Sequence, residues 1–403
     1  MKQGPKISRK GGGKRKKTGK NRSFRFELLV FAFVVCVTAG IYFIVKFLPE
    51  GDRSPSRSPL FEIYSSENFE VRLKHLDRAI YASLVALGVS VDDVEFPSVY
   101  TKYSKGLHWG FAVLEIRPPK SPSKADIQTI LDRHLSKEVS GATYQIASDD
   151  RYPVVYVSLD RHPTHRLVFL EKLIKAPPPP VLKQLPKISI ILDDVGYDKK
   201  IALDFLSLDA PITVSIFPFS PYRKTIASAA HEKGRDVMLH LPMEPQEYPE
   251  VNPGEGVLLT SMDRDMLLAQ LEEDLEAIPY IVGVNNHMGS KFTKDPERMT
   301  YILKRLQKKG LFFVDSRTTT RTCVRKVAKR IKLRFAERQV FLDHLEEASF
   351  IRAQIKQLVS IARSKGSAIG IIHPHRLTYR IIKEALPSLK KVVEVVPVSH
   401  LIN

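Results

Sequence analysis

The segment Ile188-Ser189-Ile190-Ile191-Leu192-Asp193-Asp194-Val195-Gly196 gives the clearest indication of the fold. Its mostly apolar first half predicts a buried strand, because a strand covered on both faces of a sheet reads as a nearly continuous hydrophobic run. Two carboxylates follow the apolar core at once, and Gly196 opens a loop. The same order, an apolar core followed directly by polar residues, recurs along the rest of the chain.

Strand-like and helix-like segments alternate from Lys187 onward. Strands are expected at the following residues: 188–192, 212–217, 236–241, 281–284, 311–314, 339–342, 368–372 and 392–396. Between them, Asp295-Pro296-Glu297 begins a helix that Gly310 ends, and a second helix is expected at 346–365. This alternation predicts a parallel sheet covered on both sides, either an incomplete β/α barrel or an open doubly wound sheet.

The polar residues that follow these strands are of the types that carry chemistry. In parallel β/α folds the carboxyl ends of the strands open on one face, where active sites are built. Five expected strands end in such residues: Asp193 and Asp194, His240, Asn286 and His287, Asp315, and His373 and His375. The pattern therefore predicts that these side chains converge on one basin.

Carboxylate and imidazole ligands together suit a divalent metal such as zinc. A catalytic zinc ion keeps one position open for water, so three protein ligands suffice, and we expect Asp194, His240 and His287 to supply them. Asp193 would accept the proton of the water, and His373 or His375 would protonate the leaving amine. The structural alternatives are a turn or N-cap role for each aspartate and a core position for each histidine.

Five stretches carry a resemblance to a known family: 190–196, 238–245, 283–290, 313–317 and 371–375. Together they resemble the divergent polysaccharide deacetylase family, bacterial proteins related to the carbohydrate esterases that remove N-acetyl groups from chitin-like and peptidoglycan sugars. The resemblance covers about residues 187–402. It implies a deformed β/α barrel, a divalent metal, most simply Zn²⁺, and an acetylated polysaccharide as substrate.

The resemblance also implies roles for individual residues. In the broader deacetylases the paired aspartates are base and metal ligand, which correspond to Asp193 and Asp194. Those relatives use two histidines four residues apart, whereas here Glu244 stands four residues after His240, so His287 is expected to complete the ligand set from another strand. Three further residues are expected to bind substrate or to hold the ligands in position: Asn286, Asp315 and Glu244.

Two classes of function are open. The first is a hydrolase that removes acetyl groups from an envelope polysaccharide such as peptidoglycan, with an esterase acting on O-acetyl groups as a variant, because the same chemistry serves amides and esters. The second is a non-catalytic envelope protein that binds glycan or a protein partner through the same basin. Retention of both a base, Asp193, and a proton donor favours the hydrolase.

The charge of the chain is unevenly distributed. The 403 residues carry a formal net charge of +19, and residues 1–25 contain 11 Lys and Arg and no acid. The remainder carries about +8, so the overall basicity mostly describes this tail. Without a zinc-finger spacing, a P-loop or an interleaved aromatic and basic strand motif, no nucleic-acid partner is expected.

The basic tail is followed by a predicted membrane anchor at 26–48. Residues 28–45 are uncharged and mostly apolar, a length that can cross a bilayer with some tilt. Positive charge stays on the cytoplasmic side, so we expect a single-pass protein of the inner membrane whose C-terminal domains lie on the periplasmic side. A cleaved signal peptide is the alternative.

Two domains are expected after a polar linker at 49–59. A small α+β domain at 60–172 should contain helices at 69–87 and 122–135 and strands at 107–116, 142–147, 154–159 and 166–170, with His162 and His165 as surface residues of a turn. Residues 173–186 include four consecutive prolines and read as a stiff linker. The deacetylase-like β/α domain then occupies 187–403.

Overall fold

The structure is a computed structural model that describes residues 69–104, 107–136, 139–148, 152–171 and 184–402. The expected tail, membrane anchor and first linker at 1–59 lie outside these residues. None of the described helices is both long and apolar enough to cross a membrane. The membrane anchor therefore remains a prediction from the sequence.

The first group of elements forms one mixed sheet with two helices. In chain order these are α2 Phe69–Ala86, the one-turn η1 Val91–Asp93, β1 Val94–Ser104, β2 Leu107–Ile116, α3 Lys124–Leu131, η2 Asp132–Ser136, β3 Ala142–Ser148, β4 Pro153–Leu159 and β5 His162–Phe169. The strand order is β1-β2-β5-β4-β3, with β2 and β5 parallel and the other pairs antiparallel. This is the α+β arrangement expected for this segment, with β1 as a strand that the sequence pattern did not predict.

His162 and His165 were predicted to be surface residues of a turn, and the structure corrects this. Both lie in β5, which begins earlier than predicted. His165 is buried, and its Nε2 lies 3.2 Å from Asp77 Oδ1 on α2. The proline between them did not end the strand, because a proline at the start of a strand removes only one ladder hydrogen bond.

The second group of elements alternates strand and helix as predicted. Its elements are β6 Lys187–Val195, α4 Lys199–Leu206, β7 Thr213–Ile216, α5 Arg223–Glu232, β8 Val237–Met243, α6 Arg264–Ala277, β9 Ile281–Met288, η3 Phe292–Lys294, α7 Pro296–Lys308, β10 Phe312–Asp315, α8 Val324–Ile331, β11 Phe335–Glu337, β12 Val340–Phe341, α9 Ala348–Lys365, β13 Ser367–Ile372, α10 Arg376–Leu389, β14 Glu394–Val395 and η4 Val398–Leu401. Every ladder in their sheet is parallel.

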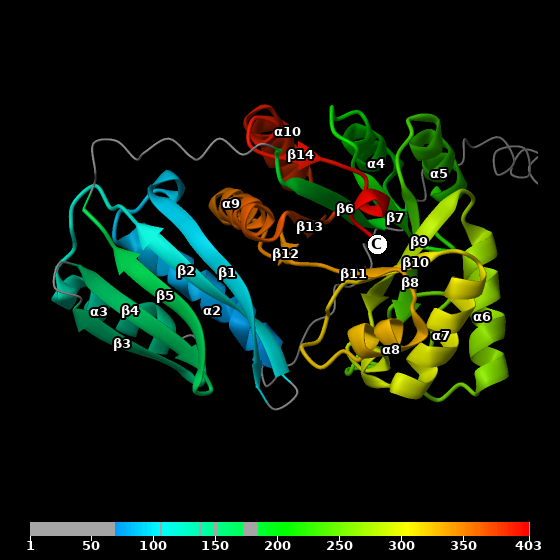
Figure 1. The fold of residues 1–403 in the computed structure, drawn as a ribbon, viewed down its shortest axis with the longest axis horizontal. Coiled ribbons are helices and arrows are strands. Elements are labelled where there is room, and N and C mark those ends of the chain that lie inside the picture. Colours follow the sequence, from blue (N-terminus) through cyan, green and yellow to red (C-terminus); the bar gives the residue numbers. More distant parts are fainter. Residues whose placement is uncertain (1–68, 105–106, 137–138, 149–151, 172–183, 403) are drawn as a thin grey trace, which may run out of the picture. The chain divides into compact units, whose positions relative to one another are not determined.

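This sheet is a curled, incomplete barrel rather than an open doubly wound sheet. The strand order is β11-β10-β9-β8-β7-β6-β13-β12, and β14 pairs with the start of β6. The six strands β6 to β11 thus follow one another in chain order, and the helices that connect them lie on the outside of the curve (Figure 1). Among the described residues no ladder joins β11 to β12, so the barrel is not closed.

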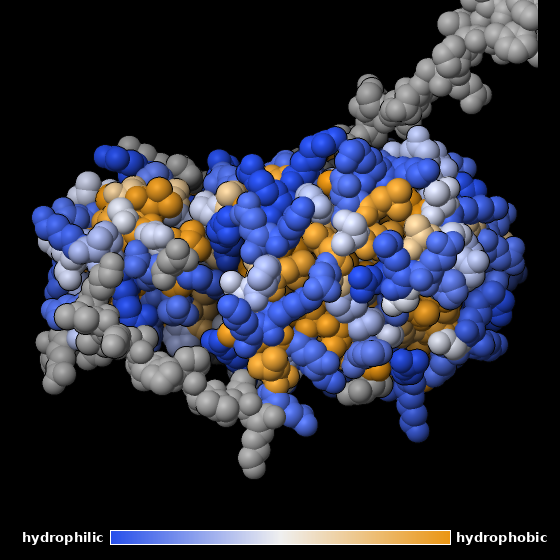
Figure 2. All heavy atoms as spheres, turned by 90° about the horizontal axis from the view of Figure 1, so that it is seen from above, coloured by the Kyte–Doolittle hydropathy of each residue, from blue (hydrophilic) through white to orange (hydrophobic). Residues whose placement is uncertain are grey.

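Local sequence signals explain where the helices begin and end. Asp295 Oδ1 accepts hydrogen bonds from the backbone N–H groups of Glu297 and Arg298, both at 3.0 Å, which caps α7. α9 ends at Gly366, whose φ of 83° is a conformation that glycine adopts without strain. The apolar faces of these helices are buried, and hydrophilic side chains cover much of the surface visible in Figure 2.

Candidate metal centre and active site

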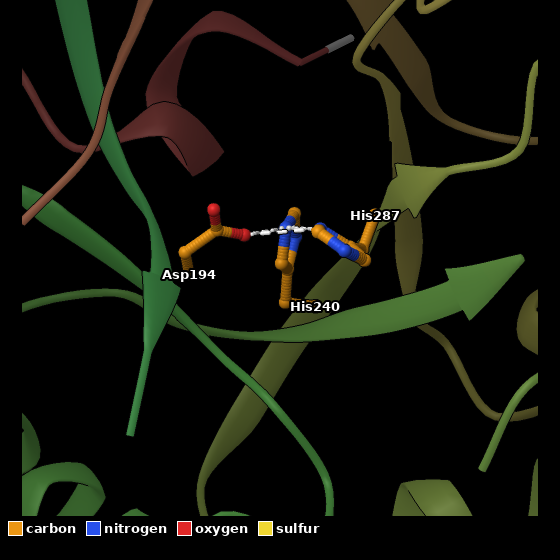
Figure 3. Close-up of side chains that lie close together, drawn as sticks. All are labelled: Asp194, His240 and His287. Carbon is orange, nitrogen blue, oxygen red and sulfur yellow. Dashed lines mark hydrogen bonds and ion pairs between the residues drawn. The ribbon is translucent and has the colours of Figure 1, made fainter. Parts of the chain in front are cut away.

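Asp194, His240 and His287 come together at the carboxyl ends of β6, β8 and β9 (Figure 3). Asp194 Oδ1 lies 2.9 Å from His240 Nε2 and 3.0 Å from His287 Nδ1. The two ring nitrogens are 3.1 Å apart. All three residues are buried, so three potential ligand atoms face one another in a small enclosed space.

A bulge in β6 brings two adjacent aspartates to the same basin. Neighbouring residues of a regular strand point to opposite faces of the sheet. The register of β6 with β7 shifts between Leu192 and Val195, and Asp194 has a φ of 57°, in the left-handed region that non-glycine residues rarely adopt. Such a conformation persists where the surrounding structure imposes it, often at a functional site.

The loop after this bulge is also tightly fitted. Gly196 has a φ of 135°, and a Cβ at this position would collide with the side chain of Ser220. Only glycine therefore allows the chain to leave β6 in this direction while Ser220 keeps its place. The sequence Asp193-Asp194-Val195-Gly196 thus encodes both the pair of carboxylates and the turn that presents them.

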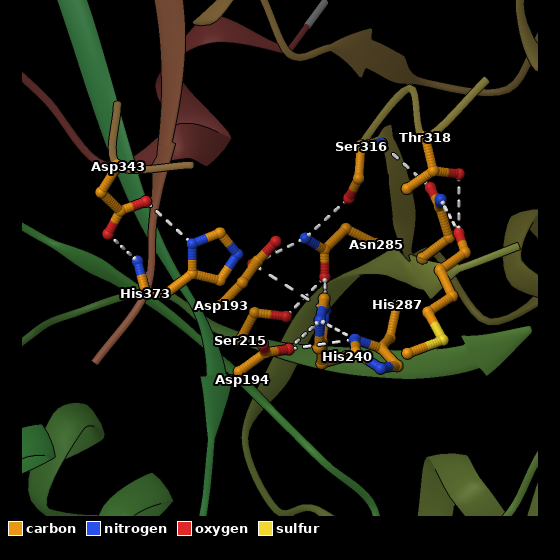
Figure 4. A network of polar contacts seen from close by, with 12 residues as sticks. Asp193, Asp194, Ser215, His240, Asn285, His287, Ser316, Thr318, Asp343 and His373 are labelled. Atoms are coloured by element: carbon orange, nitrogen blue, oxygen red, sulfur yellow. Dashed lines mark hydrogen bonds and ion pairs between the residues drawn. The ribbon is translucent and has the colours of Figure 1, made fainter. Parts of the chain in front are cut away.

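Asn285 links Asp193 to His240 through a single amide group (Figure 4). Its Nδ2 donates to Asp193 Oδ1 at 2.8 Å, so its oxygen faces His240 Nδ1 at 2.9 Å. Ser215 Oγ donates to the same oxygen. Because an amide oxygen can only accept, His240 Nδ1 must carry a proton, which leaves Nε2 as the atom available to bind a metal.

The three ligand atoms fit a divalent cation. With Nδ1 protonated, the Nε2 of a neutral His240 directs a lone pair toward Asp194 Oδ1, and His287 Nδ1 lies close to both atoms. Electron-rich atoms at such distances repel each other unless a positive charge lies between them. Tetrahedral ligands held about 2.0 to 2.2 Å from one zinc ion lie roughly 3.3 to 3.6 Å apart, so the three atoms need to separate by only a few tenths of an ångström to hold the ion.

The protonation of Asp194 and His287 is compatible with metal binding. Burial alone would raise the pKa of Asp194, but His287 and His240 hold it well below its usual range. Burial lowers the pKa of His287 despite the neighbouring carboxylate of Asp194. An ionised carboxylate and a neutral imidazole are the forms in which these groups bind a metal.

The two aspartates also act on His240. Burial alone would lower the pKa of His240, but Asp193 and Asp194 together raise it. The ring of Phe217 lies 5.1 Å from the ring of His240 and 4.7 Å from that of His287, centroid to centroid, and covers both on one side. The two carboxylates thus favour a positive charge at the place where the ligand atoms meet.

Asp193 is positioned as a base beside the ligand atoms. It is buried, and burial raises the pKa of its carboxyl group, although His240 and His373 oppose the shift. Asn285 holds Oδ1, and no hydrogen bond is recorded for Oδ2 among the described residues. A carboxylate with a raised pKa is a stronger base than an ordinary aspartate, so Oδ2 is suited to accept a proton.

His373 and Asp343 form a second pair on the same cavity. Asp343 Oδ1 lies 2.8 Å from His373 Nδ1, and Asp343 Oδ2 accepts from the backbone N–H of His373 at 2.7 Å and from Thr378 Oγ1 at 2.9 Å. Burial would lower the pKa of His373, but Asp343 raises it to about 9. His373 is therefore protonated near neutral pH and is suited to donate a proton.

His375 is less firmly held than His373. It precedes α10, and its Nδ1 lies 4.0 Å from Glu346 Oε2, a partner whose side chain is mostly exposed. Both histidines line the cavity that contains Asp193, Asp194 and His240. Of the two proton donors that the sequence left open, His373 is therefore the better oriented.

Asn286 plays a structural part in this arrangement. It lines the cavity, but its Nδ2 donates to the backbone oxygen of Met288 and its Oδ1 accepts from the backbone N–H of Ser316. In a strand, residues two apart share a face, so Asn285 and His287 point together and Asn286 points away. The amide of Asn286 holds two loops rather than facing the ligand atoms.

Glu244 and Asp315 were expected to bind substrate or support the ligands, and the structure places their carboxylates elsewhere. Glu244 Oε1 pairs with Lys291 Nζ at 2.6 Å, and Oε2 accepts from the backbone N–H and the hydroxyl of Thr260. Asp315 accepts from the backbone N–H of Arg317 and from Thr322 Oγ1. Neither residue lines the cavity, and each ties a loop to the end of a strand.

Asn285 and Asp343 belong to the site but were not predicted from the sequence. Signals for both existed: Asn285 stands two positions before His287, on the same face of an expected strand. Asp343 follows the expected strand at 339–342 in the same way that His240 and Asp315 follow theirs. Its acidic surroundings, with Glu346 and Glu347 shortly after, resembled the start of a helix instead.

Comparison with known proteins agrees with this geometry. The model of a family described as divergent polysaccharide deacetylase matches residues 190–402. An uncharacterized protein of Haemophilus influenzae is 35% identical over 219 residues, which are 53% of this chain and 76% of that protein. YibQ of Escherichia coli, also uncharacterized, is 32% identical over 217 residues, which are 54% of this chain and 67% of YibQ.

A solved structure shares the fold. The crystal structure of an uncharacterized protein from Agrobacterium tumefaciens is 23% identical, with a TM-score of 0.53, and the match covers 55% of this chain and 92% of that one. At this level of identity the likeness shows the fold alone. The family match spans more than half of the chain, from the strand that carries the paired aspartates to the last turn of helix. The chain therefore belongs to the divergent polysaccharide deacetylase family.

Proposed function

We propose that this chain is a metal-dependent hydrolase that removes acetyl groups from an envelope polysaccharide such as peptidoglycan. The observation that carries the proposal is the meeting of Asp194 Oδ1, His240 Nε2 and His287 Nδ1 within about 3 Å of one another, beside a buried carboxylate. Two groups suited to opposite proton transfers, Asp193 and His373, share the cavity with them.

The residues divide the reaction between them. A bound divalent cation, most simply Zn²⁺, supplies polarisation of the acetyl carbonyl and makes a water molecule more acidic. Asp193 Oδ2 takes a proton from the water molecule while the water oxygen forms a bond to the carbonyl carbon. Asn285 holds the other carboxylate oxygen, so the direction of proton transfer is fixed before substrate binds.

His373 completes the reaction at the leaving group. When the bond between the carbonyl carbon and the sugar nitrogen breaks, the nitrogen needs a proton, which His373 donates. Asp343 keeps His373 protonated and fixes the orientation of its ring through Nδ1. The products are acetate and a free amine on the sugar.

The polysaccharide is proposed from the family to which the chain belongs. The proposed location, on the outer side of the inner membrane, rests on the basic tail and the apolar run at 26–48. A reporter enzyme that is active only outside the cytoplasm, fused after Asn403, tests the location separately. Activity of the reporter supports it, and a silent but expressed fusion contradicts it.

Acetate release tests the activity. The purified protein with added Zn²⁺ is incubated with chitin oligomers and with isolated peptidoglycan, and free acetate is measured. Asp193→Asn should abolish release, whereas Asp209→Asn, which changes an exposed carboxylate on a distant loop, should not. No release from any glycan, combined with stable glycan binding, would favour a binding protein instead.

A further inference from the structure

One continuous segment concentrates the positive charge of the C-terminal half. Residues 298–336 contain thirteen Lys and Arg and a single acid, Asp315, which gives them a net charge of +12. Residues 26–403 as a whole carry about +8, so the rest of that part is slightly acidic. Asp315 is fully buried and accepts hydrogen bonds within its own loop, so it does not offset the basic surface.

Most of these bases belong to α7 and α8. The two helices are adjacent in the fold (Figure 1). Gln307 Nε2 on α7 donates to the backbone oxygens of Ile331 and Lys332 at 2.7 and 3.3 Å, and Arg330 on α8 donates to Thr300 Oγ1 at 2.7 Å. We call the exposed bases of this pair the α7–α8 basic face: Lys304, Lys308, Lys326, Lys329, Arg330 and Lys332.

Nearby acids neutralise other bases and leave this face charged. Asp295 pairs with Arg298 at 2.8 Å, Glu272 pairs with Arg305 and Lys309, and Glu337 pairs with Arg325. Within the described ranges, no ion pair is recorded for any residue of the α7–α8 basic face. The face is therefore a concentrated positive surface rather than one half of an internal network of ion pairs.

The arrangement is unfavourable for the helices themselves. Lys304 and Lys308 are four residues apart on α7, and Lys326 and Arg330 are four residues apart on α8. Like charges at this spacing lie side by side on a helix and destabilise it. A solvated helix gains nothing from this spacing, whereas an external polyanion would be attracted by it.

A short loop connects the rim of the candidate active site to the start of α8. Ser316 and Thr318 line the cavity, and the loop that holds them runs directly into α8 past the exposed Arg321. A polymer that extends from the cavity along this loop would meet the α7–α8 basic face first at the N-terminal end of α8. The apolar side chains of α8 are packed inside the fold, so the helix has no free apolar face to insert into a membrane.

We propose that the α7–α8 basic face binds a carboxylate-bearing polysaccharide, such as the peptide-substituted chains of peptidoglycan, and extends substrate binding beyond the cavity. This proposal rests on the proposed function, since it names the charge of the polymer that the site acts on. Binding through such a face is electrostatic, so it weakens as salt screens the charges.

The test is co-sedimentation of the full-length, detergent-solubilised protein with isolated peptidoglycan at increasing NaCl concentration. The variant Lys326→Glu, Lys329→Glu, Lys332→Glu should bind at least about tenfold more weakly and lose most of the salt dependence. A control with the same change in charge, Lys199→Glu, Lys224→Glu, Lys233→Glu on α4 and α5, should bind within about twofold of wild type. Thermal unfolding verifies that both variants are folded.

Two further measurements separate the possible outcomes. Asp193→Asn should bind peptidoglycan as wild type does, and the triple α8 variant should still release acetate from a short, uncharged chitin oligomer. Charge-dependent binding without any acetate release would refute the hydrolase and leave this proposal standing. Equal binding of peptidoglycan by wild type and the triple α8 variant would overturn the proposal for the α7–α8 basic face.

A membrane partner gives a different result. In protein reconstituted into phosphatidylglycerol vesicles, amine-reactive labelling reports whether Lys326 and Lys329 are covered. Both should stay reactive with vesicles alone and become protected when peptidoglycan is added. Protection by the vesicles alone would assign the face to the lipid surface and contradict the proposal.

Discussion

The amide group of Asn285 contacts both His240 and Asp193, so its removal should affect both residues. In Asn285→Ala, His240 is free to adopt the other tautomer, and Asp193 loses the donor that fixes its Oδ1. Because such supporting contacts typically change metal affinity by about 10 to 100 times, we expect a loss of that size for Zn²⁺. Competition with a chromophoric chelator measures it.

The control for this prediction is Asn252→Ala. Asn252 also uses its side chain to hold a backbone N–H, that of Gly254, but in an exposed loop. The Asn252→Ala variant should leave the affinity for Zn²⁺ unchanged. Wild-type affinity in Asn285→Ala would mean that the ring of His240 is oriented by its packing alone.

Asp343 sets the pH range in which His373 can act as an acid. Asp343 raises the pKa of His373 to about 9, so the histidine stays protonated through neutral pH and loses its proton as the pH rises through that value. In Asp343→Asn the charge is gone, burial dominates, and the pKa of His373 falls. The alkaline limb of the kcat profile for acetate release should therefore move to lower pH.

The same experiment has a clear negative result. If the alkaline limb of Asp343→Asn coincides with that of wild type, His373 is not the proton donor. Asp204→Asn, on the exposed surface of α4, serves as the control for the loss of one carboxylate and should leave the limb in place.

At the scale of elements, the sequence predicted every strand of the curled parallel sheet except β11. β6, β8, β9 and β13 are short, mostly buried runs with apolar cores, and polar residues follow these cores, which identifies them. β11 has only three residues, two of them partly exposed, so its pattern does not differ from that of a loop. The bulge in β6 was also beyond sequence reasoning, because it depends on the register against β7.

The same limit applies to the candidate site. That His240 and His287 follow strand cores could be inferred from the chain alone. That Asn285 fixes one ring nitrogen of His240 follows from the register of β8 against β9, in which His240 faces Asn285. Pairwise contacts between strands are set by packing of the whole sheet, so the residues that support the ligands were harder to predict than the ligands.

Asp274 on α6 gives a prediction about stability. It is fully buried, its Oδ2 has no hydrogen-bond partner among the described residues, and burial raises the pKa of its carboxyl group to about 8. An unfolded aspartate has a pKa of about 3.9. The folded state therefore holds the proton more tightly than the unfolded state does. As a result, the free energy of unfolding decreases as the pH rises from about 4 to 8.

Replacement of Asp274 by asparagine should remove this decrease in the free energy of unfolding. We expect Asp274→Asn to be more stable than wild type at pH 8 by roughly 1 to 3 kcal/mol, and to show a flatter dependence of the free energy of unfolding on pH. Chemical denaturation at pH 5 and pH 8 measures both. A variant with the same pH dependence as wild type would show that Asp274 is ionised at no cost.

At the scale of the whole molecule, a bound cation would tie three separate strands together. β6, β8 and β9 each contribute one ligand, so the cation stabilises the folded state over the unfolded one. Removal of the metal with a chelator should lower the Tm of the protein, and added Zn²⁺ should restore it. The variant His287→Ala should show a much smaller response to either treatment.

The central claim is that Asp194, His240 and His287 hold one divalent cation. Elemental analysis of the purified full-length protein, after incubation with Zn²⁺ and removal of the excess, measures this directly. We expect about one metal ion per chain for wild type and far less for Asp194→Ala and His240→Ala. A folded wild-type protein that retains no metal, or variants that retain as much as wild type, would contradict it.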